Sequence, residues 1–170
     1  MVLAAVCLAA AACGRDPGTF APPPQQSSDW GPDPAEIGAW VRMEDPAAAD
    51  YIVRDIAAEA GFQRWALRNP ELKFRVKSAT GLKFAMDFAV PEVTFRDTGP
   101  VTISGAVNGQ AIGAMRCDHP GDYRFEKSVP AAVVDPERDV HVTLAAEPRW
   151  VSPQDGAQLS FLLRGAGFTQ

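Results

Sequence analysis

Three neighbouring residues, Cys117, Asp118 and His119, have the side chains with the widest chemical range in this sequence. Thiolate, carboxylate and imidazole groups all bind metal ions. The next residues, Pro120-Gly121, are typical of a turn, and no second Cys/His pair completes a set of four ligands. We therefore predict no metal site and no cofactor, and we expect Cys117 to be a small core residue.

Acid–base catalysis has candidate groups but no recognisable arrangement of them. The acidic residues Asp118, Asp122, Glu126 and Asp139 qualify only because they carry carboxylates. A hydrolase needs a nucleophile with a base, or two carboxyl groups of different pKa. The sequence has no G-x-S-x-G, glycine-rich phosphate loop or H-E-x-x-H motif. We predict no catalytic residue and a protein that is not an enzyme.

Basic side chains gather between positions 64 and 83, where Glu71 is the one acidic residue. The group consists of Arg64, Arg68, Lys73, Arg75, Lys77 and Lys83. In a chain of net charge −5, such a group suits an anionic partner: a charged polysaccharide, a lipid head group or an acidic protein surface. The alternative is a solvated face whose lysines prevent edge-to-edge aggregation. The negative net charge disfavours nucleic acid as a partner.

Two tryptophans, Trp65 and Trp150, are candidates for a glycan platform. Neutral sugars require exposed aromatic rings with polar side chains beside them. Trp65 shares its alternation phase with Gln63 and Leu67, so the sequence leaves open which face of its strand is buried. The alternative for both tryptophans is a place in the core.

The N-terminus predicts an export signal. Residues 2–12 are Ala, Val or Leu except for Cys7, and a run of this length is typical of a secretory signal rather than a membrane span. The stretch LAAAAC, ending at Cys13, resembles a bacterial lipoprotein signal, in which the cysteine receives acyl chains such as palmitate. Two features depart from that pattern, because Ala10 stands where Leu is preferred and no basic residue precedes the apolar run. An annotated start codon too far downstream would explain why no basic residue precedes the apolar run. A plain secretory signal is the alternative.

The resemblance implies three segments: a signal peptide with a truncated n-region at 1–12, a lipid-anchored, proline-rich tether at 13–35 and a domain at 36–170. The tether is rich in Pro, Gln, Ser and Gly and predicts extended chain. More than one acyl chain on Cys13 would attach the protein stably to a membrane. In lipoproteins with this pattern, an Asp directly after the lipidated cysteine favours retention at the inner membrane. Gly14 stands at that position here. The resemblance therefore implies the bacterial cell envelope, with the outer membrane favoured.

From residue 62 onward, apolar residues alternate with polar ones, which is the period of β-strands. The stretches ELKFRVKS and LKFAMDFAV flank Ala79-Thr80-Gly81 and predict a hairpin in which Val76 opposes Phe84 and Lys77 opposes Lys83. The core side is expected to hold Leu72, Phe74, Val76, Leu82, Phe84, Met86, Phe88 and Val90.

Further strands follow to the end of the chain, and Asn108-Gly109 is a strong signal for a second hairpin. Residues 51–56 suit a short strand, with a helix as the alternative. No long amphipathic helix lies between the strands. The predicted fold class is therefore all-β, an antiparallel, jelly-roll-like β-sandwich behind a disordered N-terminal tail.

The order of three cues resembles a β-sandwich like those of carbohydrate-binding modules, over roughly residues 50–168. The cues are Arg64-Trp65, Asn108-Gly109 and the closing stretch DGAQLSF from Asp155. Similar domains occur in bacterial lipoproteins and beside glycosyltransferases or methyltransferases. The resemblance implies a fold rather than a ligand.

Together these observations predict an envelope-anchored, non-catalytic module that binds a glycan or another envelope component. One alternative is a structural or assembly lipoprotein that contacts only protein partners. The other is an enzyme with an unrecognised site.

Overall fold

The computed structural model describes residues 36–170. The predictions for the signal peptide, for Cys13 and for the tether lie outside the described residues. In the described part of the chain, no helix is both long enough and apolar enough to cross a membrane.

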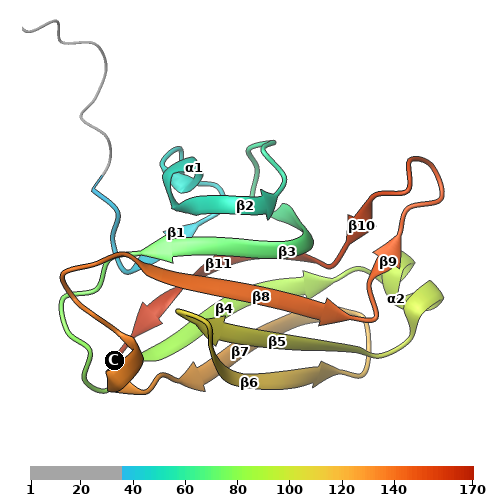
Figure 1. Ribbon diagram of the computed structural model, residues 1–170. Coiled ribbons are helices and arrows are strands. Elements are labelled where there is room, and N and C mark those ends of the chain that lie inside the picture. The colour runs from blue at the N-terminus through green and yellow to red at the C-terminus, as the bar shows by residue number, and fades with distance from the viewer. Residues whose placement is uncertain (1–35) are drawn as a thin grey trace, which may run out of the picture. The chain divides into compact units, whose positions relative to one another are not determined.

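Short strands make up most of the domain (Figure 1). The strands are β1 (Trp40–Arg42), β2 (Ile52–Ile56), β3 (Arg64–Phe74), β4 (Lys83–Val90), β5 (Val101–Val107), β6 (Gln110–Cys117), β7 (Gly121–Ser128), β8 (Val140–Glu147), β9 (Trp150–Val151), β10 (Gln158–Leu159) and β11 (Phe161–Thr169). The helices are α1 (Ala48–Tyr51), α2 (Glu92–Thr98) and the 3₁₀ turn η1 (Ala131–Val133).

The strands form an antiparallel β-sandwich, as the alternation predicts. Hydrogen-bonded neighbours follow the order β6-β5-β8-β3-β11-β4-β7, with β1 added to β11 and β2 added to β3. The first half of β3 pairs with β11 and its second half with β8, so β3 and β11 join the two layers. Many neighbours are distant in sequence, which is typical of a jelly-roll-like topology. The prediction of an all-β sandwich is confirmed.

The core lies between the layers and is built around phenylalanine rings. All eight residues assigned to the core side of the first two long strands are buried. The Phe74 ring centroid lies 5.8 Å from that of Tyr51, 6.4 Å from that of Phe84 and 5.6 Å from that of Phe168. These rings come from α1, β3, β4 and β11, so this cluster ties both layers together.

The predicted hairpin between β3 and β4 is wrong. Leu72 pairs with Val142 of β8, whereas Phe84 pairs with Lys127 of β7 and with Phe168 of β11. The connection over 75–82 therefore crosses from one layer to the other, and Lys77 does not face Lys83 across a strand pair. The local turn chemistry is right, because Gly81 has a positive φ of 70°. Alternation determines which face of a strand is buried and leaves its neighbour open.

The second predicted hairpin is confirmed. Val107 of β5 pairs with Gln110 of β6 across Asn108-Gly109. Both turn residues have positive φ, 47° and 83°, as a two-residue turn between twisted strands requires.

Residues 46–60 contain both structures that the sequence left open. The helix α1 covers a single turn, and the strand β2 follows at Ile52. Residues 52–56 are thus the predicted short strand. The helix α2 was not predicted, although Pro91 before it and Gly99 after it are ordinary signals for a helix start and stop.

Candidate functional site

The two candidate platform tryptophans line the same groove, of about 510 Å³, at one end of the sandwich. Trp65 comes from the start of β3 and Trp150 from β9, and their positions in the sequence are far apart. In Figure 1, β9 lies on the right of the view, between β10 and α2. Its lining includes Glu59, Trp65, Val93, Arg96, Asp97, Trp150, Gln154, Asp155 and Leu159. We call this the Trp65–Trp150 groove.

Trp65 faces outward because its neighbour Arg64 faces inward. The Arg64 side chain is buried, and its Nε donates a hydrogen bond of 3.1 Å to the Met43 carbonyl. Successive residues of a strand point to opposite faces, so Trp65 lies on the outer face, directly opposite Leu162 of β11. It is half-buried. The structure thus resolves the alternation that the sequence left open at this strand.

Trp150 is held by a short hairpin and by a hydrogen bond. In the β9–β10 pair, Trp150 lies opposite Leu159. The indole Nε1 donates a 2.8 Å hydrogen bond to Asp97 Oδ2, at the end of α2. The indole NH is therefore satisfied, and the half-buried ring contributes its apolar surface to the groove.

Two carboxyl groups in the groove are kept ionised by their hydrogen bonds. The hydrogen bond from Trp150 holds the pKa of Asp97 below its usual value. Hydrogen bonds from Ser152 and from the Ala157 amide likewise hold the pKa of Asp155 below its usual value. Both groups are therefore acceptors, not proton donors, at neutral pH.

The charged residues of the groove give it an acidic balance. Glu59, Asp97 and Asp155 carry carboxylates, against the single guanidinium of Arg96. Arg96 is itself paired with Asp97 at 3.4 Å. Gln154 adds a neutral amide to the lining. The groove therefore offers aromatic rings and hydrogen-bond acceptors, in surroundings that repel anions.

The predicted basic face is divided among several environments. Arg64 is buried and faces the core, so it is not part of any outer face. Lys83 lies on β4, in the other layer from Lys73 on β3, and pairs with Glu126 at 3.2 Å. Arg68 is exposed in β3, and its carbonyl accepts a hydrogen bond from Arg149 Nη1 at 3.4 Å.

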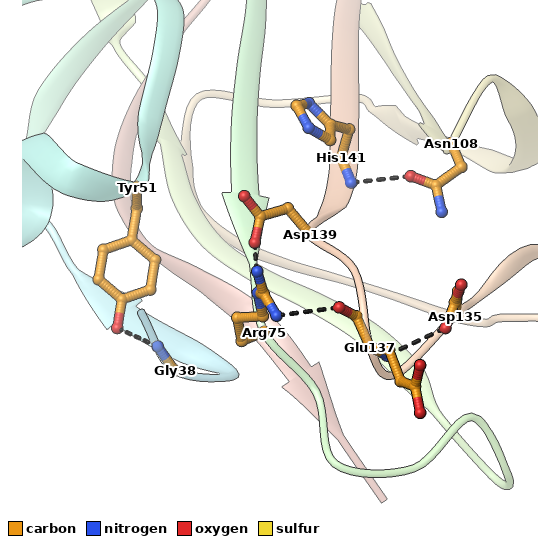
Figure 2. Close-up of polar contacts among 8 residues, drawn as sticks. All are labelled: Gly38, Tyr51, Arg75, Asn108, Asp135, Glu137, Asp139 and His141. Carbon is orange, nitrogen blue, oxygen red and sulfur yellow. Dashed lines mark hydrogen bonds and ion pairs between the residues drawn. The ribbon is translucent and has the colours of Figure 1, made fainter. Parts of the chain in front are cut away.

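Arg75 is bound into the loop before β8. Its Nε pairs with the Asp139 carboxylate, and its Nη1 donates a 3.1 Å hydrogen bond to the Glu137 carbonyl, as Figure 2 shows. In the same view, Asn108 Oδ1 accepts a hydrogen bond of 2.9 Å from the amide of His141. Arg75 thus has its polar partners within the domain.

A larger groove, of about 870 Å³, lies where β3 ends. Arg75 and Lys77 line it together with apolar side chains that include Ile37, Val76 and Phe168. Its lining contains no tryptophan or tyrosine, so it lacks the half-buried indole rings that line the Trp65–Trp150 groove.

Cys117, Asp118 and His119 do not form a site. Cys117 is buried, and burial raises the pKa of its thiol to about 11, with the Asp118 carboxylate adding to the effect. Asp118 pairs with Arg116 at 2.6 Å, and the His119 ring stacks on Tyr123. Among the described residues, no group of three or more His, Cys, Asp or Glu side chains is placed to hold a metal ion.

Sequence reasoning identified both tryptophans and missed their polar partners. Asp97 and Arg96 belong to α2, whose start and stop signals were available in the sequence. Asp155 begins the stretch DGAQLSF, which the sequence offers only as a cue to the family resemblance. Their meeting with Trp150 depends on contacts between distant segments, which no local pattern contains.

No protein-family model and no curated protein sequence matches this chain. Among solved structures, the chain is similar to an acetyl xylan esterase from the rumen bacterium Butyrivibrio proteoclasticus, with 13% identity, a TM-score of 0.47 and coverage of 77% of this chain and 32% of the esterase. It is also similar to an exo-β-1,3-galactanase from Phanerochaete chrysosporium, with 11% identity, a TM-score of 0.43 and coverage of 78% and 29%.

A third similar structure is the carbohydrate-binding module CBM36, in complex with calcium and xylotriose. Its identity is 13% and its TM-score 0.39, and the match covers 76% of this chain and 98% of the module. The chain spans about a third of the length of the two enzymes. Likenesses at this level establish neither a shared family nor a shared ligand.

Proposed function

We propose that this protein is a non-catalytic glycan-binding module, attached to the bacterial cell envelope through a lipid on Cys13. The observation that carries the glycan-binding role is the meeting of Trp65 and Trp150 in one groove with polar side chains around them. The glycan-binding role belongs to the described domain, and the proposed anchor rests on the N-terminal sequence.

A sugar ring combines an apolar C–H face with a rim of hydroxyl groups. Aromatic rings suit the apolar face, and carboxylate or amide groups suit the rim. In this groove, Trp65 and Trp150 provide the rings, whereas Asp97, Asp155 and Gln154 provide the polar groups. The same set of side chains would be a poor lining for a purely apolar ligand, because its carboxylates would lose their hydration.

The charge of the groove favours a neutral glycan over an anionic one. Three carboxylates and one guanidinium line it, and like charges at close range oppose binding. A sulfated or uronic-acid-rich polysaccharide would face this repulsion, whereas a neutral polysaccharide would not.

Asp97 and Asp155 suit a role in binding better than a role in hydrolysis. Glycoside hydrolysis commonly uses one carboxyl group with a raised pKa as the proton donor. Hydrogen bonds lower the pKa of both Asp97 and Asp155, which makes each a weak source of protons. A role in holding hydroxyl groups suits such residues better.

Binding to immobilised polysaccharides tests the proposal. We expect the purified full chain to be retained on at least one neutral polysaccharide among xylan, cellulose, β-1,3-galactan and chitin. The variants Trp150→Ala and Trp65→Ala should lose that retention while keeping a cooperative unfolding transition. The matched control is His119→Ala, which removes an exposed ring stacked on Tyr123, outside the groove.

Two results would contradict the glycan-binding role. One is the absence of retention on every neutral polysaccharide. The other is equal retention of the wild type and of a folded Trp150→Ala variant.

A protein partner is the second candidate function, because two exposed valines lie at the groove. Val93 lines the groove and is 46% exposed, whereas Val151 follows Trp150 outside the lining and is 55% exposed. A protein surface would cover both, whereas a glycan in the groove need not cover Val151. Val151→Ser should then weaken capture of an envelope protein by the chain without changing retention on polysaccharide.

The anchor is tested separately. Wild-type chain expressed in a bacterium with isotope-labelled palmitate should carry the label and sediment with membranes. The variant Cys13→Ser should carry no label and stay in the supernatant. A wild-type chain without label would contradict the lipid anchor and leave the glycan-binding role untouched.

A further inference from the structure

A second aromatic groove, of about 360 Å³, lies on the outer face of the layer that contains β1, β11 and β4. We call it the Trp40–Phe62 groove, and its lining consists of Trp40, Arg42, Glu44, Phe62, Asp87, Arg164 and Gly165. Phe62 is 62% exposed, more than any other large apolar side chain that the structure describes. An aromatic ring left in water at this cost suggests a ligand or partner that covers it.

The Trp40 ring lies on the backbone of β11. A Cβ atom at Gly165 would come 3.5 Å from Trp40 Cζ2 and 3.1 Å from the Val41 carbonyl oxygen. This close approach holds the indole of Trp40 against the strand. Because Trp40 also lines the groove, part of its ring surface is accessible to a ligand. Trp40 is half-buried.

Outward side chains of β11 connect this groove to the Trp65–Trp150 groove. Leu162 lies directly opposite Trp65. The next outward residue is Arg164, whose Nε donates a hydrogen bond of 3.3 Å to Gln63 Oε1. The Arg164 guanidinium lies 5.2 Å from the centroid of the Phe62 ring.

These contacts define one surface that runs along β11, which we call the β11 strip. Its members are Trp150, Trp65, Leu162, Arg164, Phe62 and Trp40. All of these side chains are aromatic or aliphatic except that of Arg164. Both ends are aromatic grooves.

The charges along the strip are matched within the domain. Arg164 pairs with Asp122 at 2.8 Å, and Arg124 pairs with Asp87 at 2.9 Å. Arg124 also lies over Trp40, at 5.9 Å from the ring centroid. The cations along the strip are therefore already paired and do not favour an anionic ligand. This agrees with the acidic balance of the Trp65–Trp150 groove.

The separation of the grooves determines the length of a ligand that fills both. Leu162, beside Trp65, and Gly165, beneath Trp40, are three residues apart, which is at most about 10 Å because the register shifts between Leu163 and Gly165. The grooves themselves extend beyond these two points. A single sugar ring is comparable in size to an indole and cannot cover both grooves.

We propose that the β11 strip is an extended binding surface for an internal stretch of a neutral polysaccharide. The Trp65–Trp150 groove holds one set of sugar units, and the Trp40–Phe62 groove holds units further along the same chain. This inference rests on the proposed glycan-binding function and adds to it that the ligand is a polymer, not a chain end or a small sugar.

Calorimetric titration with oligosaccharides of increasing length tests the extension. The probes are neutral xylo-, cello-, galacto- and chito-oligosaccharides, each as the disaccharide and the hexasaccharide, with the full chain. We expect the hexasaccharide of the preferred series to bind at least tenfold more tightly than the disaccharide. Phe62→Ala should weaken hexasaccharide binding about three- to tenfold, as expected for the loss of one ring contact. It should leave disaccharide affinity unchanged.

The matched control is Val53→Ala, which shortens another exposed apolar side chain, 42% exposed and on β2. It should change neither affinity. Trp40→Ala should act as Phe62→Ala does, and Phe62→Ala keeps the test valid if the Trp40 variant fails to fold.

The results separate the two proposals. Equal affinities for disaccharide and hexasaccharide overturn the extended strip and leave the Trp65–Trp150 groove as a site for short glycans. Equal weakening of both lengths by Phe62→Ala also overturns it. If no neutral oligosaccharide binds at any length, the glycan-binding role falls together with the strip.

Discussion

The indole Nε1 of Trp150 donates a 2.8 Å hydrogen bond to Asp97 Oδ2, which joins β9 to the end of α2. The two residues are 53 positions apart in the sequence. The contact orients one wall of the Trp65–Trp150 groove. It also gives the indole NH a hydrogen-bond acceptor within the protein. It is therefore the most direct point at which to test the site.

Replacing Asp97 should weaken glycan binding without unfolding the domain. Asp97→Ala removes the acceptor for Trp150, so the ring loses a fixed orientation. We expect this loss of orientation to lower the affinity by up to about tenfold. Fluorescence titration of the tryptophans with the preferred oligosaccharide measures it.

The control for Asp97→Ala is Asp118→Ala, which removes another exposed carboxylate that is paired with an arginine. It should bind as the wild type does. An Asp97→Ala variant with unchanged affinity would show that the ring keeps its place without this hydrogen bond.

Binding should be insensitive to pH until the medium is strongly acidic. The hydrogen bond from Trp150 places the folded-state pKa of Asp97 below its usual value of 3.8. Above pH 3.8 the ionised Asp97 therefore contributes its full stabilisation to the folded domain, and this contribution is lost as the pH falls through the lower, folded-state pKa. The orientation of the Trp150 ring, on which we expect affinity to depend, follows the same ionisation. Affinity should therefore stay level from neutral pH to about pH 5 and fall only below the usual Asp range. A decline between about pH 7 and about pH 5 would indicate control by a histidine instead.

Two phenylalanines should differ sharply in their effect on the free energy of unfolding. Phe74→Ala removes a buried ring that packs against Tyr51, Phe84 and Phe168, and should cost about 3–5 kcal/mol. Phe62→Ala removes a ring that is 62% exposed and should cost less than about 0.5 kcal/mol. Urea unfolding followed by far-UV circular dichroism compares them. Similar losses for both variants would contradict the assignment of Phe62 to the surface.

The basic residues should give no specific affinity for polyanions. A variant with Gln at Lys73, Arg75, Lys77 and Lys83 should elute from a sulfated-polysaccharide column at the same salt concentration as a control variant of equal net charge. The control carries Gln at Arg54, Arg116, Lys127 and Arg138. The physical reason is that Arg75 and Lys83 already pair with Asp139 and Glu126.

Earlier elution of the first variant alone would contradict this expectation. It would show that the basic residues act together as a site for an anionic partner, as the sequence allows.

The sequence by itself determined which side chains are buried wherever apolar and polar residues alternate clearly. The alternation of apolar and polar residues placed Leu72, Phe74, Phe84 and Phe88 in the core, and all four are there. It also located the Asn108-Gly109 hairpin, because turn residues with positive φ act locally. Burial of one strand face and the shape of a tight turn depend on neighbours in the chain, which a sequence displays directly.

The tertiary structure alone decided which strands are partners and which residues meet at the grooves. Leu72 pairs with β8 rather than β4, and the basic residues are consequently spread over two layers. Trp65 lies on the outer face because the adjacent Arg64 is buried and donates a hydrogen bond to the Met43 carbonyl. Trp150 meets Asp97 only because β9 lies beside α2. Such contacts depend on the packing of segments that are distant in the chain. The free energy of that packing cannot be inferred from any short stretch of sequence.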